Sequence, residues 1–304
     1  MRLGASVSPR GAVRAEVLGP ARLHRRQSPS DHAYRVARIY VYHWSSSPPR
    51  GHVAIVTGGA TNLGRAAAAE FARCGADVVI ADRNADALEA AAAEIGPRCT
   101  WVSGDIREVA DCERIVGVAL DRHGRVDTLL NNAGGEHYAA ADVSTPEGWA
   151  AVQRLNTDGT QQMTHACVER ALRTGGGGMI ASVAVSARHG LTATVDELTR
   201  EWAQRWQEDG ISAVALALDC RDPEQRGRTA ELVGGVGRPA PLGRLGEPHE
   251  FGWLAALVAS PLGRSLSGTT ITLDGAAGDW WGPWPLVALA NETVTVSADQ
   301  RRSI

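Results

Sequence analysis

The sequence predicts an α/β fold in which a single doubly wound parallel sheet of about seven strands carries helices on both faces. From Gly51 onward, short apolar runs alternate with longer alanine-rich or amphipathic segments, as in strands joined by helical crossovers. A glycine-rich turn links the first apolar run to the first helical segment. With 44% hydrophobic and 21% charged residues, the chain is not an intrinsically disordered one.

The first half of the alternation has clear local signals. The apolar run 52–57 predicts a strand, and the alanine-rich segment 63–74 predicts a helix. A second buried strand is expected at 77–81, followed by a helix over 84–95 with Asn84 as its N-cap. The pattern continues with strands at 99–102 and 126–130 and with a helix at 108–123.

The second half follows the same alternation. A long helix is expected over 146–174, because four consecutive glycines then end it. The next elements are a strand at 179–185, a helix at 195–207 and a strand at 211–218. A helix at 247–259 and a strand at 269–273 complete the predicted sheet.

The ends of the chain differ in composition from this domain, which we place at residues 51–277. Residues 1–50 hold nine arginines against two acids and lack the apolar segment of a secretory signal. We expect a disordered basic extension or a start site assigned too far upstream, with an organelle transit peptide as the alternative. Residues 278–304 form a C-terminal tail that contains the aromatic segment 280–285, which is expected to cap an apolar pocket or to pack on a neighbouring subunit.

Composition excludes several classes of function. All 31 basic residues are arginine, so no mechanism that needs a lysine is available. The five cysteines form no CxxC pair, which argues against a metal site and a disulfide framework and favours a reducing, cytoplasmic location. No apolar run approaches the ~20 residues of a membrane span. No nucleic-acid-binding module is recognisable, so we expect neither membrane nor nucleic acid as a partner.

The segment Thr57–Gly64 predicts a dinucleotide site. A glycine-rich turn between a strand and a helix lets the backbone approach a pyrophosphate at the helix N-terminus. Asp82 ends the second strand, where its carboxylate can accept hydrogen bonds from ribose hydroxyls and would repel a 2′-phosphate. NAD is therefore expected in preference to NADP, although Arg83 could soften that preference. The alternative interpretation of Asp82 is an acid at the start of the next helix.

Several further motifs share one order and spacing with a known family. They are Gly104-Asp105-Ile106, Asn131-Asn132-Ala133-Gly134, Asn156, and the segments 241–248 and 267–275. With the turn and Asp82, they resemble the short-chain dehydrogenase/reductase family over about residues 51–277. The resemblance implies a Rossmann-type domain, a small-molecule substrate and a homodimer or homotetramer. The segments 131–137, 148–152 and 201–203 resemble the enoyl-CoA reductase-like branch more narrowly, which implies an acyl-thioester substrate.

The turn and the resemblance together give a set of expected cofactor-binding residues. The resemblance implies that Asp105 and Ile106 lie near the adenine. Asn62 departs from the family, which has a glycine at that position; asparagine can adopt left-handed backbone angles, but its bulk could weaken binding. The expected set is Thr57, Gly58, Asn62, Leu63, Gly64, Asp82, Arg83, Asp105, Ile106, Asn132, Ala133 and Gly134.

The catalytic half departs from the family. The resemblance implies a tyrosine for proton transfer and a lysine four residues later that lowers its pKa, yet these positions fall at Arg188 and Thr192. Arginine stays protonated and threonine carries no charge, so neither can take its role. The connection before this helix is also shorter than in the family. Asn156 and Ser186 remain as the candidate catalytic residues.

Each of these candidates also has a purely structural interpretation. Asn156 could be only a helix-kink residue, and Ser186 only a loop serine. Tyr138 and His189 are weaker candidates for a substitute acid. Trp202 and Trp206, one helical turn apart, are either core or dimer-interface residues.

Three hypotheses of function follow from the sequence. The first is a short-chain dehydrogenase/reductase-type oxidoreductase that binds NAD(H), acts on a carbonyl or enoyl substrate and has an impaired or non-standard active site. The second is a catalytically inactive nucleotide-binding protein that serves as a sensor or scaffold. The third is a degenerate product that folds poorly.

Overall fold

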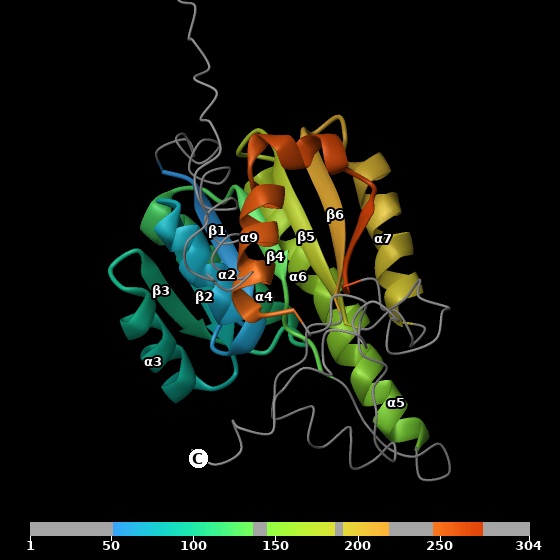
Figure 1. The fold of residues 1–304 in the computed structure, drawn as a ribbon, viewed down its shortest axis with the longest axis horizontal. Coiled ribbons are helices and arrows are strands. Elements are labelled where there is room, and N and C mark those ends of the chain that lie inside the picture. Colours follow the sequence, from blue (N-terminus) through green and yellow to red (C-terminus); the bar gives the residue numbers. More distant parts are fainter. Residues whose placement is uncertain (1–50, 136–144, 186–190, 219–245, 276–304) are drawn as a thin grey trace, which may run out of the picture. The chain divides into compact units, whose positions relative to one another are not determined.

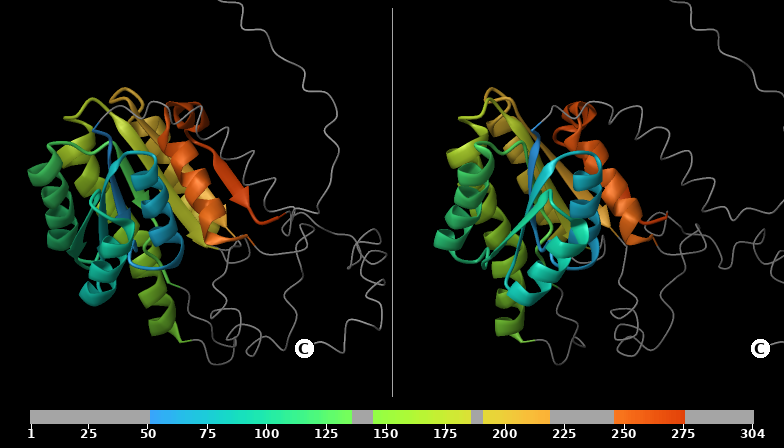
Figure 2. Two further views of the ribbon diagram at one scale, coloured as in Figure 1. Left: turned by 60° about the vertical axis from the view of Figure 1, so that its left-hand side comes forward. Right: turned by 90° about the vertical axis from the view of Figure 1, so that its left-hand side faces the viewer.

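The computed structural model describes residues 51–135, 145–185, 191–218 and 246–275. Within these residues a seven-stranded parallel sheet has the order β3-β2-β1-β4-β5-β6-β7, with helices on both faces (Figures 1 and 2). The predicted doubly wound α/β fold is confirmed. The strands are β1 (Val53–Thr57), β2 (Asp77–Asp82), β3 (Cys99–Ser103), β4 (Thr128–Asn131), β5 (Gly178–Val185), β6 (Ile211–Leu218) and β7 (Thr270–Leu273).

The helices differ from the prediction at two places. The expected helix over 146–174 is continuous but contains two π-helical segments, η1 and η2, and the expected helix at 195–207 already begins at Leu191. The α-helices are α2 (Asn62–Arg73), α3 (Ala85–Ile95), α4 (Val109–His123), α5 (Pro146–Gln153), α6 (Thr160–Cys167), α7 (Leu191–Arg205) and α9 (Pro248–Ala259). The other helical segments are η1 (Arg154–Gly159), η2 (Val168–Leu172) and the 3-10 helix η3 (Pro261–Leu266).

Strand order explains where a ligand site can form. β1 pairs with β2 on one side and with β4 on the other, in register Ile55 to Val79 and Ile55 to Leu129. The chain winds outward from β1 to β3 and then returns to start the other half at β4. All strands are parallel, so their carboxyl ends lie at one edge, and the crevice between β1 and β4 opens there.

Two hydrophobic clusters cover the faces of the sheet. One packs α4, α6 and α7 against residues such as Ile55 and Leu129, and the other packs α2, α3 and α9 against residues such as Ile80 and Leu130. α2 and α9 approach closely, because a Cβ at Gly252 would lie 2.8 Å from the carbonyl oxygen of Ala66. Strands β1 and β6, which both have a neighbour on each side, are buried along their whole length, as expected for a parallel sheet.

The tryptophans of α7 belong to the core. Trp202 and Trp206 are 3% and 1% exposed, and their rings stack at a centroid distance of 6.1 Å. His165 of α6 meets the Trp206 ring edge-on at 5.7 Å. The packing alternative is therefore confirmed, and the interface alternative is wrong, because both indoles are already covered within one chain.

Two further expectations can be compared with the described residues. The Asn84 side chain accepts a hydrogen bond from the Ala87 amide at 3.1 Å, so the predicted N-cap of α3 is confirmed. Among the described helices, none is both long and apolar enough to cross a membrane.

His52 is half-buried at the amino-terminal edge of the sheet. Its Nε2 lies 3.0 Å from the Thr128 hydroxyl. Nearby, the Asp127 carboxylate accepts the Val53 amide at 2.8 Å and pairs with Arg125. Burial lowers the pKa of His52 below its ordinary value, against the opposing attraction of Asp127.

The folded protein should therefore lose stability when His52 is driven to charge. The pKa of His52 is lower in the folded protein than in the unfolded chain, so neutral His52 favours the folded state. This contribution to the free energy of unfolding is fully present above the unfolded pKa. It is lost as the pH falls from the unfolded pKa toward the folded pKa. Each pH unit inside that window costs up to about 1.4 kcal/mol. Urea unfolding at pH 7.5 and 5.5 should show a larger loss for the wild type than for His52→Gln, and equal losses would contradict this role.

Candidate functional site

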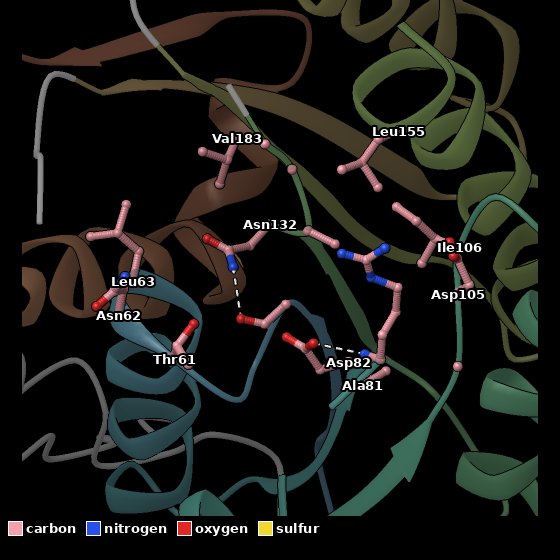
Figure 3. Close-up of a pocket in the computed structure, with 16 residues that line it drawn as sticks. Thr61, Asn62, Leu63, Ala81, Asp82, Asp105, Ile106, Asn132, Leu155 and Val183 are labelled. Atoms are coloured by element: carbon pink, nitrogen blue, oxygen red, sulfur yellow. Dashed lines mark hydrogen bonds between the residues drawn. The ribbon is translucent and has the colours of Figure 1, made fainter. Parts of the chain in front are cut away.

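A pocket opens at the carboxyl edge of the sheet where β1 and β4 diverge (Figure 3). It combines the turn after β1, the end of β2, the segment after β3, the segment after β4, and apolar residues of η1 and β5. Ten of the expected cofactor residues line it, and only Thr57 and Gly64 do not. The lining residues are Gly58, Thr61, Asn62, Leu63, Ala81, Asp82, Arg83, Gly104, Asp105, Ile106, Asn132, Ala133, Gly134, Gly135, Leu155 and Val183.

The glycine turn is shaped by backbone angles that few residues adopt. Gly58 has φ of +64° and Asn62 has φ of +46°, so asparagine takes the left-handed conformation expected of it at this position. Gly64 lies where α2 crosses the turn, and a Cβ there would be 2.1 Å from the carbonyl oxygen of Gly58. The turn therefore brings bare backbone to the start of α2, which is the geometry that a pyrophosphate requires.

Thr57 and Asn132 join this turn to β4. The Thr57 hydroxyl accepts the amides of Asn132 and Ala133 at 3.1 and 3.0 Å. In the opposite direction, the Asn132 side-chain amide donates to the carbonyl oxygens of Thr57 and Gly58, each at 3.1 Å. Thr57 thus has a positioning role beneath the pocket, while Asn132 both braces the turn and lines the pocket (Figure 3).

Asp82 stands at the end of β2 on the pocket wall. Its Oδ1 accepts the backbone amides of Arg83 at 2.7 Å and Asn84 at 3.3 Å (Figure 3). The carboxylate therefore also organises the start of α3, so the helix-start interpretation and the ribose-binding interpretation are compatible. Arg83 lines the same wall and is exposed.

Asp105 is held by an arginine that the sequence analysis did not single out. Arg107 donates to both carboxylate oxygens through Nε at 3.0 Å and through its terminal nitrogen at 2.5 Å. The Asp105 backbone amide donates to Asp111 at 2.8 Å. The hydrogen bonds from Arg107, with a smaller attraction from Arg83, hold the pKa of Asp105 below its usual range, so this carboxylate stays charged beside the pocket.

Asn156 lies in η1 and clamps the segment after β4. Its Oδ1 accepts the Gly135 amide at 2.9 Å, and its Nδ2 donates to the Gly135 carbonyl oxygen at 2.7 Å. A Cβ at Gly134 would lie 2.7 Å from the same Oδ1, so a larger residue here would displace the Asn156 side chain. Asn156 is thus a positioning residue for the pocket wall, and its location in a π-helix agrees with the helix-kink interpretation.

Asn131, at the end of β4, takes part in a buried polar network. Asn131 is 2% exposed, and its Nδ2 donates to the hydroxyls of Thr164 at 2.8 Å and Ser182 at 3.3 Å. These bonds link β4, α6 and β5 directly below the pocket edge. A network of this kind fixes the relative positions of the three elements.

The expected proton-transfer residues fall outside the described residues. Ser186, Arg188, His189 and Tyr138 all lie in undescribed segments. Thr192 belongs to the first turn of α7. The interpretation of this half of the site therefore still depends on sequence.

The structure adds lining residues that no local signal identified. Val183 of β5 and Leu155 of η1 add apolar side chains to the pocket lining, Val183 on the side of Asn132 and Leu155 on the side of Ile106 (Figure 3). In sequence, each is an ordinary apolar residue of a buried element, so only the arrangement of β5 beside β4 brings it to the site. Ala81 of β2 is a further lining residue of this kind, whereas Thr61 already belongs to the turn Thr57–Gly64 that the sequence predicted as a dinucleotide site.

Cysteine and metal chemistry find no support in the described residues. No group of His, Cys, Asp or Glu side chains there could hold a metal ion. The four described cysteines are free, and burial raises the pKa of both Cys74 and Cys99 to about 11. Such thiols stay protonated at neutral pH and are poor nucleophiles.

Comparison with known proteins gives the family. The family described as enoyl-(acyl carrier protein) reductase matches residues 58–276. A sorbitol dehydrogenase of Cereibacter sphaeroides is 31% identical over 76% of this chain and 98% of its own length. The chain belongs to the short-chain dehydrogenase/reductase family.

Other relatives show the breadth of the family around this chain. A probable 2,4-dienoyl-CoA reductase of Bacillus subtilis is 31% identical over 76% of this chain and 97% of its own length. The crystal structure of an actinorhodin polyketide ketoreductase variant with NADPH has a TM-score of 0.70 at 22% identity and covers 75% of this chain and 98% of its own. That last likeness supports the fold alone. The short-chain dehydrogenase/reductase fold predicted from the motifs is thus confirmed.

Gly64→Ala should damage this site without unfolding the domain. The new methyl group would meet the Gly58 carbonyl oxygen and the Asn132 amide, so the turn must move away from the pyrophosphate position. We expect at least a tenfold loss of NADH affinity in a fluorescence titration, which is about 1.4 kcal/mol. Ala69→Gly, at an exposed position of α2, is the control: it costs the helix ~1 kcal/mol but should leave affinity unchanged. Equal affinity in Gly64→Ala and wild type would rule out this turn as the pyrophosphate site.

Proposed function

We propose that this protein is an NAD(P)-dependent oxidoreductase that transfers a hydride to or from a carbonyl or enoyl group of a small molecule, at a low rate. The observation that carries the proposal is one continuous pocket whose lining includes Asp82, the glycine turn and Val183. A dinucleotide that lies in this direction has its ribose at Asp82, its pyrophosphate at the N-terminus of α2 and its nicotinamide beside β4 and β5.

The proposed cofactor preference is NAD over NADP. The Asp82 carboxylate suits two ribose hydroxyls and repels a 2′-phosphate. Asp105 adds a second charged carboxylate to this end of the pocket, and its charge is partly offset by Arg107 and Arg83. The NADPH of the ketoreductase structure belongs to that protein and gives no support to the preference, which therefore depends on Asp82.

The described residues account for binding and orientation. The bound nicotinamide would supply or accept the hydride. Thr57 and Asn132 hold the turn, and Asn156 holds the 132–135 segment through Gly135, so the pocket wall is fixed before a ligand arrives. Val183 adds an apolar side chain at the end of the pocket where the nicotinamide would lie. Orientation of two bound reactants can supply about 7–11 kcal/mol of rate acceleration.

The sequence offers no standard proton donor for the proposed reaction. A positioned acid or base contributes about 10²–10⁴ in rate. Arg188 and Thr192 cannot supply it, and Ser186 would at most hold a substrate oxygen. We therefore propose slow turnover, with Asn156 as a positioning residue rather than a proton donor.

A second candidate is a nucleotide-binding sensor or scaffold without catalysis. The observation that favours it is the absence of lysine from the entire sequence, since no lysine can then lower the pKa of a tyrosine. Both candidates share the cofactor pocket, so only turnover separates them. The substrate class proposed for the first candidate is an acyl thioester or a related carbonyl compound, in line with the enoyl reductase-like motifs.

The remaining sequence expectations are also proposals. We propose a domain over 51–277 with a basic extension at 1–50 and a tail at 278–304. We also propose a cytoplasmic location and assembly into a homodimer or homotetramer.

The cofactor preference can be tested with Asp82→Asn. Asparagine keeps an oxygen that can accept the Arg83 and Asn84 amides, so α3 should keep its start while the charge is lost. We expect the ratio of NADH to NADPH affinity to fall at least tenfold in a titration of the full chain, with binding also visible as a higher melting temperature. Asp86→Asn, in the exposed first turn of α3, removes the same charge and should leave the ratio unchanged.

Two outcomes would count against the proposal. An unchanged ratio in Asp82→Asn would show that Asp82 is only a helix-start residue. A wild-type protein that melts cooperatively but binds neither NADH nor NADPH would end the oxidoreductase and the sensor proposals together.

The impaired active site predicts a gain of function. Restoring the family-length loop before α7 together with Arg188→Tyr and Thr192→Lys should raise the rate of NADH oxidation with a dienoyl or enoyl thioester by about 10²–10⁴. The matched control carries the same loop and lysine but Arg188→Phe, which lacks the hydroxyl group and should show no gain. Equal rates in both cofactor-bound variants would overturn the assignment of positions 188 and 192.

A further inference from the structure

The Asp105 carboxylate lines the pocket, and the arginine that holds it, Arg107, is not one of the lining residues. The Arg107 side chain donates to Oδ1 and Oδ2 of Asp105 through Nε, at 3.0 Å each, and to Oδ2 through a terminal nitrogen at 2.5 Å. The backbone amide of Arg107 donates to Oδ1 at 3.0 Å. Paired donors of this kind fix the plane of a carboxylate as well as its position.

The backbone beneath this carboxylate is anchored separately. The Asp105 amide donates to the Asp111 carboxylate at 2.8 Å, and the Ile106 carbonyl oxygen accepts the Cys112 thiol at 3.2 Å. Ile106 is 4% exposed and lies against η1, where a Cβ at Gly159 would be 2.9 Å from its side chain. The backbone is thus held by α4 and η1, and the side-chain torsions of Asp105 are the freedom that the arginine removes.

Strand pairing places Asp105 next to the proposed ribose site. Asp82 of β2 pairs in register with Ser103 of β3, and the Gly104 amide donates to the Asp82 carbonyl oxygen at 2.8 Å. Asp82 and Asp105 therefore lie on neighbouring segments of one pocket wall (Figure 3). A ribose bound at Asp82 brings its base to the segment 104–106, and this step rests on the proposed function.

The hydrogen bonds of Asp105 determine which base its carboxylate can accept. A charged carboxylate has about four acceptor positions and no donor. Three N–H groups of Arg107 occupy three of these positions, so about one remains for a ligand. Hydrogen bonds from Arg107 hold the pKa of Asp105 below its usual range, so the group stays an acceptor at neutral pH. Such a group favours a base with an amino group and disfavours a base with an oxo group at the same place.

We propose that Arg107 is a positioning residue for base recognition, because it holds the Asp105 carboxylate where a free acceptor position meets the amino group of the dinucleotide's purine base. The competing interpretation is a partly exposed ion pair without a role in binding, since such pairs contribute little to stability. The two interpretations differ in what happens to base selectivity when the arginine is replaced.

Titration of the full chain with two dinucleotides tests the proposal. The probes are NADH and reduced nicotinamide hypoxanthine dinucleotide, which has an oxo group in place of the amino group of adenine. We expect the wild type to bind NADH about tenfold more tightly, as for one hydrogen bond to a charged acceptor. Arg107→Met should reduce this preference to about twofold or less, because the carboxylate is then free to turn.

Two further variants serve as controls. Arg107→Lys keeps the charge and can still donate to the carboxylate, so it should retain more of the preference than Arg107→Met. Arg98→Met removes a comparable exposed arginine, which pairs with Asp77 at 3.1 Å at the amino-terminal edge of the sheet, and should leave the preference unchanged.

Each contrary outcome is informative. A preference in Arg107→Met equal to that of the wild type would overturn the inference. A lysine variant no better than the methionine variant would assign the effect to packing of the arginine, which also overturns it. Equal binding of both dinucleotides by the wild type would overturn this inference alone, whereas binding of neither would overturn it together with the proposed function.

An NMR titration of the Asp105 side-chain carboxyl group checks the contact without any cofactor. We expect the pKa of Asp105 to rise toward its ordinary value in Arg107→Met, because the hydrogen bonds from Arg107 are the largest cause of its depression. The smaller attraction from Arg83 remains in that variant. An unchanged pKa would show that Arg107 does not hold the carboxylate and would overturn the inference, whatever the outcome of the NADH titration.

Discussion

The Asn132 side chain ties the two halves of the sheet together at the point where the site forms. Its amide donates to the Thr57 and Gly58 carbonyl oxygens, while the Thr57 hydroxyl accepts two amides from the segment after β4. This exchange fixes the glycine turn against the end of β4, and Gly64 can then bring α2 within contact of Gly58. The shape of the glycine turn and of the pocket wall depends on these hydrogen bonds, and so does the pyrophosphate position that we propose.

The two halves of the candidate site differ. The proposed cofactor side is formed by described residues, whereas most of the expected proton-transfer positions lie in segments outside them. Asp82, Asp105 and Asn156 are each held by defined hydrogen bonds, so the side of the pocket that we propose for the cofactor is organised by the protein's own groups. The absence of lysine removes the group that normally tunes the proton donor in this family. The slow hydride transfer that we propose would therefore depend on orientation of the bound reactants.

Much of the fold and of the cofactor site could be predicted from local signals. The strand at 77–82 and the N-cap Asn84 follow from apolar runs and side-chain chemistry, which act over a few residues. The roles of Trp202 and Trp206 could not be predicted, because an apolar pair one turn apart fits a core and an interface equally well. The role of Arg107 could not be predicted, because the motif that contains Asp105 does not include an arginine.

The sequence by itself determined the doubly wound sheet, the family and the residues of the glycine turn, since periodicity and motif spacing are properties of the chain. It also determined that no lysine can take part in the chemistry. Only the tertiary structure decided that Asn156 clamps Gly135 and that Leu155 and Val183 line the same pocket as Asp82. These facts depend on which strands are neighbours and how helices pack, and contacts between distant segments leave no local trace in sequence.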